Sequence, residues 1–186
     1  MAADRDHDLA SPVDPLRDHL RGGSPTEATV LVEYGDYECP FSRAAYRSVQ
    51  QMERRFGEGL CFVFRQFPLR EIHPHAQLAA EAAEAAVAGD RFWEMHDVLF
   101  HRQRALEPED LRAYAQQVGV DVKEFDAALR DGRHRERIDE DVASGLASGA
   151  RGTPTLFIDG LLYRGSYMPA DLENALRGLR VDPEPT

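Results

Sequence analysis

The sequence has little cysteine: Cys39 and Cys61 are the only two in 186 residues. Two cysteines are too few for the disulfide framework on which small secreted domains depend. The sequence also has no apolar run of the roughly 20 residues that a membrane-spanning helix needs. We therefore expect neither a disulfide-stapled fold nor a helix that spans a membrane.

Positive charge is scarce relative to negative charge. The chain has 22 Lys and Arg residues against 33 Asp and Glu residues, which gives a formal net charge of −11. Such a chain repels the phosphates of nucleic acids and of anionic lipid surfaces. We therefore predict no nucleic-acid partner and no membrane partner.

The first residues, MAADRDHDLASPVDP, lack both the basic region and the apolar region of a secretory signal. This pattern predicts a cytoplasmic protein. Residues 1–28 are polar and rich in Asp, Pro and Gly, and we interpret them as an N-terminal extension that is partly disordered. Residues 29–186 have the length of one domain.

The stretch 29–56 has the strongest pattern of the chain. Val30–Val32 form a continuous apolar run, which indicates a buried strand. Cys39 follows and precedes Pro40, a residue suited to the first position of a helix because that position needs no N–H donor. From Phe41 the apolar residues recur at helical spacing. The order is therefore strand, turn, cysteine, helix.

A cysteine at the start of a helix is a candidate nucleophile. The unpaired N–H groups and the positive end of the helix dipole both favour the thiolate of Cys39. The adjacent Glu38 opposes a second negative charge. The alternative is an inert cysteine that packs as a small apolar residue.

Cys61 does not pair with Cys39 in the predicted topology. It lies at the start of a second strand, LCFVFRQF, which is expected to run parallel to the first. Parallel strands of this length place the two thiols about 20 Å apart, whereas a disulfide needs Cα atoms within about 7 Å. We interpret Cys61 as a structural strand residue.

Residues 73–150 have the pattern of an all-helical insertion. Helix starts are expected at Pro74, Asp90, Pro108 and Asp121, and a fifth helix at 138–146. His73 and His75 have no third ligand at a suitable spacing, so we predict no metal site. The chain then follows the order loop, strand, Asp-Gly turn, strand and helix, with these elements at 152–155, 156–158, 159–160, 161–163 and 169–179.

Cys-Pro-Phe-Ser after a strand resembles the active site of the thioredoxin superfamily, in its DsbA-like branch. That branch normally has Cys-Pro-x-Cys, and Ser42 stands here in place of the second cysteine. The resemblance covers about residues 29–179. It implies an α/β thioredoxin-like fold: a central mixed sheet flanked by helices, with an all-helical insertion domain.

The resemblance also implies roles for residues away from the cysteine. Glu33, six residues before Cys39, matches an acidic residue beneath the cysteine that accepts or returns a proton. Thr153 and Pro154 match the loop whose proline is cis and faces the cysteine. With Phe41, this loop would dock substrate, and its backbone would pair with an extended peptide.

Ser42 changes the expected chemistry. In the dithiol cycle the second thiol resolves a mixed disulfide, which a hydroxyl cannot do. We therefore expect a monothiol thiol-disulfide oxidoreductase, in which Cys39 forms mixed disulfides with protein or small-thiol substrates and an outside thiol completes the cycle. Ser42 would donate to the thiolate or serve only as a polar residue of the first turn. No bound cofactor is implied beyond a glutathione-like co-substrate, and the protein would be a monomer or homodimer.

Two alternatives come from other classes of function. A redox-inactive, chaperone-like module would bind peptides at Thr153 and Pro154, and Cys39→Ala would leave binding unchanged. A glutathione-dependent transferase or isomerase would turn over an electrophile with glutathione and would need a pocket under the helical insertion.

Overall fold

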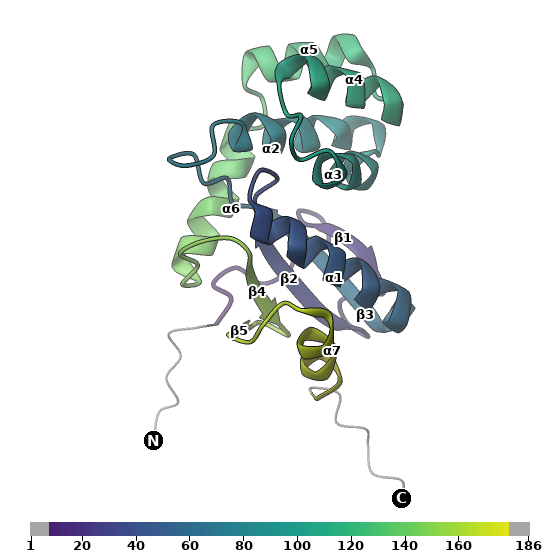
Figure 1. The fold of residues 1–186 in the computed structure, drawn as a ribbon, viewed down its shortest axis with the longest axis vertical. Coiled ribbons are helices and arrows are strands. Elements are labelled where there is room, and N and C mark those ends of the chain that lie inside the picture. Colours follow the sequence, from purple (N-terminus) through teal and green to yellow (C-terminus); the bar gives the residue numbers. More distant parts are fainter. Residues whose placement is uncertain (1–7, 179–186) are drawn as a thin grey trace, which may run out of the picture.

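The computed structural model describes residues 8–178, which form a five-stranded mixed sheet with helices on both faces (Figure 1). The strand order is β1-β3-β2-β4-β5. Strands β2 and β3 are parallel, and the other neighbouring pairs are antiparallel. The strands are β1 (His19–Gly22), β2 (Thr29–Gly35), β3 (Leu60–Gln66), β4 (Thr155–Ile158) and β5 (Leu161–Tyr163). The predicted α/β class with a mixed sheet is confirmed.

Helix α1 (Pro40–Phe56) connects the two parallel strands, followed by the short 3-10 helix η1 (Gly57–Gly59). Pro40 is its first residue, as predicted. The parallel register places Cys61 beside Val30, whereas Cys39 lies beyond the other end of β2. Both cysteines are free thiols, which confirms that Cys61 is not a partner of Cys39.

The helical elements between β3 and β4 lie mostly beyond one end of the sheet, and the last of them returns alongside it (Figure 1). They are α2 (Ala76–Ala85), the 3-10 helix η2 (Ala86–Gly89), α3 (Phe92–His101), α4 (Pro108–Val118), α5 (Val122–Asp131) and α6 (Arg135–Ala147). Helix α7 (Pro169–Gly178) packs against α1. Within residues 8–178, no helix is long and apolar enough to cross a membrane.

Two of the four predicted helix starts in the insertion are confirmed. Helix α4 begins at Pro108, and the Asp121 side chain accepts hydrogen bonds from the first turn of α5. The other two predictions were wrong by two residues for α2 and by one residue for the cap of α3, which is Arg91. Helix α2 begins at Ala76 rather than Pro74, and Asp90 is left-handed with φ of 56° instead of capping α3.

The predicted N-terminal extension contains a strand of the sheet. Strand β1 pairs with the free edge of β3, with His19 opposite Phe64 and Gly22 opposite Cys61. The segment HLRG is too short and polar to show a strand pattern, and its stability comes from the β3 edge. The expected disorder at residues 1–7 and the predicted helix residue Leu179 lie outside the described residues.

The sheet separates two apolar cores. Leu31, Phe62 and Phe64 lie on the face covered by α1 and α3, whereas Val32 and Val63 belong to the opposite core. Because side chains alternate along a strand, Glu33 of β2 faces the same side as Leu31. The sequence therefore places one carboxyl group in the core beneath α1.

Candidate active site at Cys39

Cys39 is the residue that caps the N-terminus of α1. Its backbone is extended (φ −72°, ψ 121°), and Pro40 begins the helix directly after it. The Cys39 side chain is almost fully buried, and its Sγ donates a hydrogen bond to the Thr153 carbonyl oxygen at 3.3 Å. The two stretches that the resemblance singled out, 114 residues apart, therefore meet.

The loop that faces Cys39 has a cis peptide bond between Thr153 and Pro154, as the resemblance implied. Strand β4 positions this loop because it pairs with β2, with Thr155 opposite Tyr34 near the Cys39 end. The hydroxyl oxygen of Thr153 is buried and has no partner among residues 8–178. The Thr153 carbonyl accepts from the thiol, whereas the resemblance implied a backbone free to pair with a substrate.

Glu33 lies in the sheet between Phe64 of β3 and Leu156 of β4. Its side chain is buried, and within the described chain its Oε1 has no hydrogen-bond partner. Burial without a compensating charge raises the pKa of Glu33 to about 8. At neutral pH this carboxyl group therefore favours its protonated form.

Ser42 lies in the first turn of α1 and is fully buried. Its hydroxyl oxygen accepts a hydrogen bond from the Asp36 backbone N–H at 3.3 Å. Among residues 8–178 no hydrogen bond joins Ser42 to the sulfur of Cys39. The observed contact favours the interpretation of Ser42 as a polar residue of the first turn.

Comparisons with known proteins agree with this geometry. A model of the thioredoxin family matches residues 17–177. The chain belongs to the thioredoxin family. The matching range begins before β1, in agreement with the place of that strand in the sheet.

Solved structures of DsbA-like proteins have the same fold as this thioredoxin-family chain. A thioredoxin-like oxidoreductase from Silicibacter pomeroyi superposes with a TM-score of 0.78 at 23% identity, covering 91% of this chain and 95% of that one. Oxidised BdbD from Bacillus subtilis gives 0.80 at 17% identity, with 92% and 97% covered. The thiol-disulfide exchange protein α-DsbA2 from Wolbachia pipientis gives 0.72 at 18%, with 89% and 88% covered.

Curated relatives with higher identity are longer proteins. Na(+)/H(+) antiporter NhaA 1 of Salinispora arenicola is 45% identical over 181 residues, which are 95% of this chain and 27% of that protein. Na(+)/H(+) antiporter NhaA of Herminiimonas arsenicoxydans is 43% identical over 182 residues, covering 96% and 29%. This thioredoxin-family chain spans just over a quarter of the length of these relatives.

Asp36 holds the loop that precedes Cys39 in the thioredoxin-family domain. One carboxylate oxygen accepts from the Glu38 N–H at 2.7 Å. The other accepts from the Leu69 N–H and lies 2.8 Å from His73 Nδ1. This residue ties the loop before Cys39 to the chain that leads into the insertion. The sequence reasoning missed it, since an Asp in a turn has many ordinary uses.

Glu38 makes a second link to the insertion. Its carboxylate accepts from the His75 N–H at 2.6 Å and lies 2.9 Å from His75 Nδ1. His75 Nε2 lies 3.1 Å from Glu107. The hydrogen bond with Glu38 is the main reason that the pKa of His75 is raised. The Glu38 carboxylate, whose negative charge opposes ionisation of Cys39, is therefore paired with the imidazole of His75.

Gln103, between α3 and α4, holds the backbone of Cys39 directly. Its side-chain amide donates to the carbonyl oxygens of Tyr37 and Cys39, both at 2.8 Å. No motif in the sequence indicated this residue. Two residues after Cys39, Phe41 is 60% exposed, so an apolar residue is open to solvent at the start of α1.

Proposed function

We propose that the chain is a thiol-disulfide oxidoreductase of the monothiol type. The Cys39 thiolate attacks one sulfur of a disulfide, forms a mixed disulfide with it, and releases the other half as a thiolate. A small thiolate then attacks the substrate sulfur of the mixed disulfide, which frees Cys39 as a thiolate and releases a new disulfide. The observation that carries the proposal is the placement of Cys39 at a helix start, against the cis-Pro154 loop.

A single-cysteine cycle fits the surroundings of Cys39. Ser42 occupies the place of a resolving thiol, and Cys61 is buried in β3 at the far end of the parallel pair. A mixed disulfide on Cys39 would therefore wait for a thiol from outside. The oxidoreductases among the solved structures support the type of chemistry.

Glu33 would serve as the proton acceptor and donor of the cycle. A carboxyl group with a pKa of about 8 holds its proton at neutral pH and exchanges it with a small driving force. It lies on the face of the sheet beneath α1, in the same core as the helix that begins at Pro40. We assign it a role in moving the proton of the Cys39 thiol.

The Thr153 carbonyl would alternate between two donors. In the resting protein it accepts from the thiol of Cys39. A thiolate has no proton to donate, so ionisation of Cys39 ends this hydrogen bond. The carbonyl would then pair with the main chain of an extended substrate, which Phe41 and Pro154 would contact.

The proposal is tested by incubating the protein with oxidised glutathione and measuring intact mass. We expect one glutathione adduct on wild type and on Cys61→Ser, and none on Cys39→Ser. Wild type without an adduct, or an adduct that survives in Cys39→Ser, would overturn the proposal. The pH dependence of Cys39 alkylation in the Cys61→Ser background then locates the thiolate.

Ser42→Cys provides a gain-of-function check. A second thiol one helical turn from Cys39 would attack its mixed disulfide from within the chain. We expect the glutathione adduct to disappear in Ser42→Cys without added thiol, leaving an internal disulfide. Ser48→Cys, a buried serine further along α1, should leave the adduct in place.

The antiporter activity in the names of the curated relatives belongs to proteins more than three times as long as this chain. We propose that thiol chemistry is the contribution of the quarter that this chain matches in them. The cytoplasmic location and the monomeric or homodimeric state remain predictions from the sequence.

A further inference from the structure

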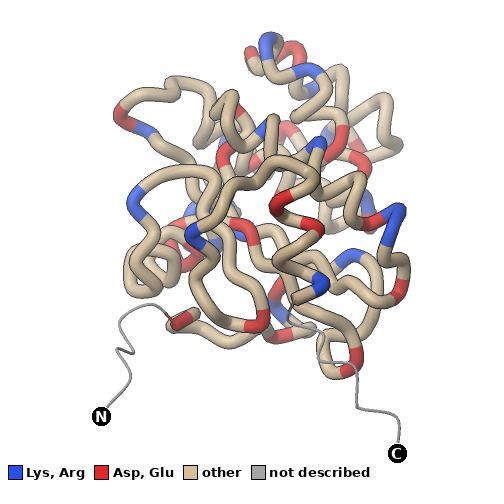
Figure 2. The backbone as a smooth tube through the Cα atoms, turned by 60° about the horizontal axis from the view of Figure 1, so that its bottom comes forward, with Lys and Arg blue, Asp and Glu red and all other residues tan. Residues whose placement is uncertain are grey.

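A cationic pocket lies between α1 and the segment that joins α3 to α4. It has a volume of about 340 Å³ and is lined by Arg43, His101, Arg102, Arg104, Ala105 and Tyr114. Four of these six side chains are Arg or His, and none is a carboxylate. This inverts the balance of the chain, which has 33 acidic residues against 22 basic ones. Over most of the described chain the two signs are interspersed (Figure 2).

We call this cavity the Arg43 pocket. Hydrogen bonds connect both of its walls to the backbone of Cys39. The Arg43 N–H donates to the Cys39 carbonyl oxygen at 3.1 Å, and the side chain of Gln103 donates to the same oxygen at 2.8 Å. Arg43 also donates to the His101 carbonyl oxygen at 3.2 Å, which joins the two walls. Arg43 follows Cys39 by one helical turn, a rise of roughly 6 Å.

The positive charges of the Arg43 pocket are not neutralised by the protein. Arg43, Arg102 and Arg104 form no ion pair with a carboxylate within residues 8–178, and the guanidinium of Arg102 lies 5.5 Å from the centre of the Tyr114 ring. By contrast, many arginines elsewhere in the described chain pair with Asp or Glu.

Two of the three carboxylates at the start of α4, those of Glu107 and Asp110, are already engaged. Glu107 lies 3.1 Å from His75 Nε2, and Asp110 accepts a hydrogen bond from the Glu107 N–H. They are therefore held in other contacts and do not line the pocket. Three unpaired guanidinium groups around one cavity leave a place for an anion from outside.

We propose that the Arg43 pocket binds the carboxylate of the small acidic thiol that completes the Cys39 cycle. This inference rests on the proposed function. Guanidinium groups bind carboxylates through paired, charge-assisted hydrogen bonds. A tripeptide thiol of the glutathione type extends for about 10 Å, at 3.3–3.6 Å per residue, and its sulfur is on the middle residue, so a terminal carboxylate lies about 5 Å along the chain from that residue. This length is similar to the rise of roughly 6 Å between Cys39 and Arg43, so the carboxylate would bind the pocket while the sulfur lies beside the mixed disulfide on Cys39.

The pocket would give the cycle a preference for acidic thiols over neutral ones. With its carboxylate bound, the incoming thiolate attacks the substrate sulfur of the mixed disulfide, the bond to Cys39 breaks, and Cys39 leaves as a thiolate. A neutral thiol of similar reactivity gains no such positioning. Because the guanidinium groups are near the surface, the preference should weaken with added salt.

The test compares glutathione with its diethyl ester as reductants of a Cys39 mixed disulfide that carries a fluorescent peptide. In R43Q/R102Q/R104Q we expect the second-order rate constant with glutathione to fall roughly tenfold, from the loss of several surface charge interactions. The rate constant with the ester should not change. Arg47→Gln, on an exposed part of α1 outside the pocket, is the matched control and should behave as wild type.

A binding measurement separates this inference from the proposed function. S-Methylglutathione cannot form a disulfide, and we expect wild type to bind it more tightly than the triple variant does. If wild type forms the mixed disulfide but the triple variant reacts normally with glutathione, the pocket inference is wrong and the proposed function stands. If wild type forms no mixed disulfide, the proposed function fails. If wild type and the triple variant also bind S-methylglutathione equally, the inference about the Arg43 pocket is wrong as well.

Discussion

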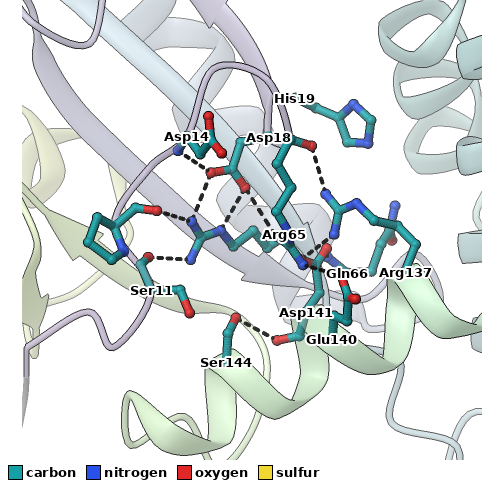
Figure 3. Close-up of polar contacts among 12 residues, drawn as sticks. Ser11, Asp14, Asp18, His19, Arg65, Gln66, Arg137, Glu140, Asp141 and Ser144 are labelled. Carbon is teal, nitrogen blue, oxygen red and sulfur yellow. Dashed lines mark hydrogen bonds and ion pairs between the residues drawn. The ribbon is translucent and has the colours of Figure 1, made fainter.

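Two ionisable side chains of the sheet, Arg65 and Glu33, lie on opposite faces and are buried in opposite ways. On the face away from α1, the Arg65 guanidinium is buried yet makes hydrogen bonds to the carboxylate of Asp18 and to the carbonyl oxygen of Ser11 (Figure 3). It also donates to the Pro12 carbonyl oxygen and to the Tyr34 hydroxyl. On the face beneath α1, Glu33 is buried with an unpaired oxygen. Arg65 is therefore a buried ion with a full set of partners. Glu33 is a buried carboxyl group without an ion partner in the described part of the chain, so it can gain or lose its proton near neutral pH.

Asp141 extends the paired network to α6. Its carboxylate accepts from the Gln66 N–H at 3.0 Å and pairs with Arg17 and Arg137 (Figure 3). Strand β3, helix α6 and the segment before β1 are thus joined by charges that all have partners. Such a network fixes a packing arrangement.

The comparison teaches how to separate structural from reactive polar groups in one domain. A buried ion that is paired loses its freedom to change charge, whereas an unpaired group gives up charge and holds a proton near neutral pH. The Oε1 atom of Glu33 and the hydroxyl oxygen of Thr153 are both buried without a hydrogen-bond partner among residues 8–178, and the backbone of Thr153 contacts Cys39 directly.

The largest expected effect is on the free energy of unfolding, and it comes from removing the paired guanidinium of Arg65. Arg65→Met takes from the buried Asp18 carboxylate its closest ion partner and leaves, within the described residues, only Arg17 at 3.6 Å, and we expect a loss of about 3 kcal/mol of unfolding free energy. Urea denaturation measures it. Arg112→Met is the control, because the ion pair of Arg112 with Asp126 is exposed and worth less than about 1 kcal/mol. Equal losses of unfolding free energy in Arg65→Met and Arg112→Met would show that the buried pair matters no more than the exposed one.

On the unpaired side, Glu33 should make stability depend on pH. Burial raises its pKa from 4.5 to about 8. The unfolded chain therefore releases this proton first, and stability falls as pH rises from about 4.5 to about 8. By pH 7 the loss is about 3 kcal/mol at roughly 1.4 kcal/mol per pH unit. Glu33→Gln should lack this decline in urea denaturation between pH 5 and pH 9.

The control for Glu33 is an exposed carboxylate, and Glu58→Gln should retain the wild-type pH profile. If Glu33→Gln and wild type decline in parallel, Glu33 ionises in the folded protein like an exposed carboxylate. The contrast between Arg65 and Glu33 would then be wrong in its claim about Glu33.

Gln103 is expected to have an intermediate effect, because its side chain donates hydrogen bonds to the backbone at Tyr37 and Cys39. Gln103→Leu removes a donor from the carbonyls of Tyr37 and Cys39, and we expect a cost of about 1–3 kcal/mol. It should also slow mixed-disulfide formation, since Cys39 loses one of its restraints. Gln117→Leu, on the exposed side of α4, should change neither quantity. A normal rate in Gln103→Leu would show that the restraint does not matter for chemistry.

The smallest expected effect concerns the link between Glu38 and His75. In Glu38→Gln we expect the pKa of His75 to fall toward its ordinary 6.5, as followed by NMR titration of the ring. The pair stabilises the fold below pH 6.5, and this contribution disappears as pH rises through the raised pKa. Because His75 is near the surface, the loss should stay below about 1 kcal/mol. Glu109→Gln should leave the titration unchanged, and the same midpoint in both variants would contradict the assignment.

The sequence was most informative where structure is local. The apolar run of β2, the Cys39-Pro40 helix start and the Asp159-Gly160 turn each depend on neighbouring residues, and all three are present. In the turn both residues have positive φ, 48° and 82°, as a two-residue hairpin loop requires.

Contacts between distant residues could not be predicted in the same way. The partner of Arg65 lies 47 residues away, in a segment whose composition resembled an extension. Gln103 is 64 residues from Cys39 and belongs to no motif. Side-chain pairing over such separations is decided by tertiary packing, so a single sequence holds no local signal for it. The cis bond at Pro154 was predicted by resemblance alone, because the general frequency of about 5–6% argues against it.

The separation of 114 residues between Cys39 and Thr153 has a consequence for biosynthesis. At about 5–20 residues per second, a ribosome needs roughly 6–23 s to add this length of chain. For that interval the nascent polypeptide contains the thiol but neither its carbonyl partner nor strand β4. We expect Cys39 to be most open to small oxidants during translation, and the arrival of the cis-Pro154 loop to end this exposed period.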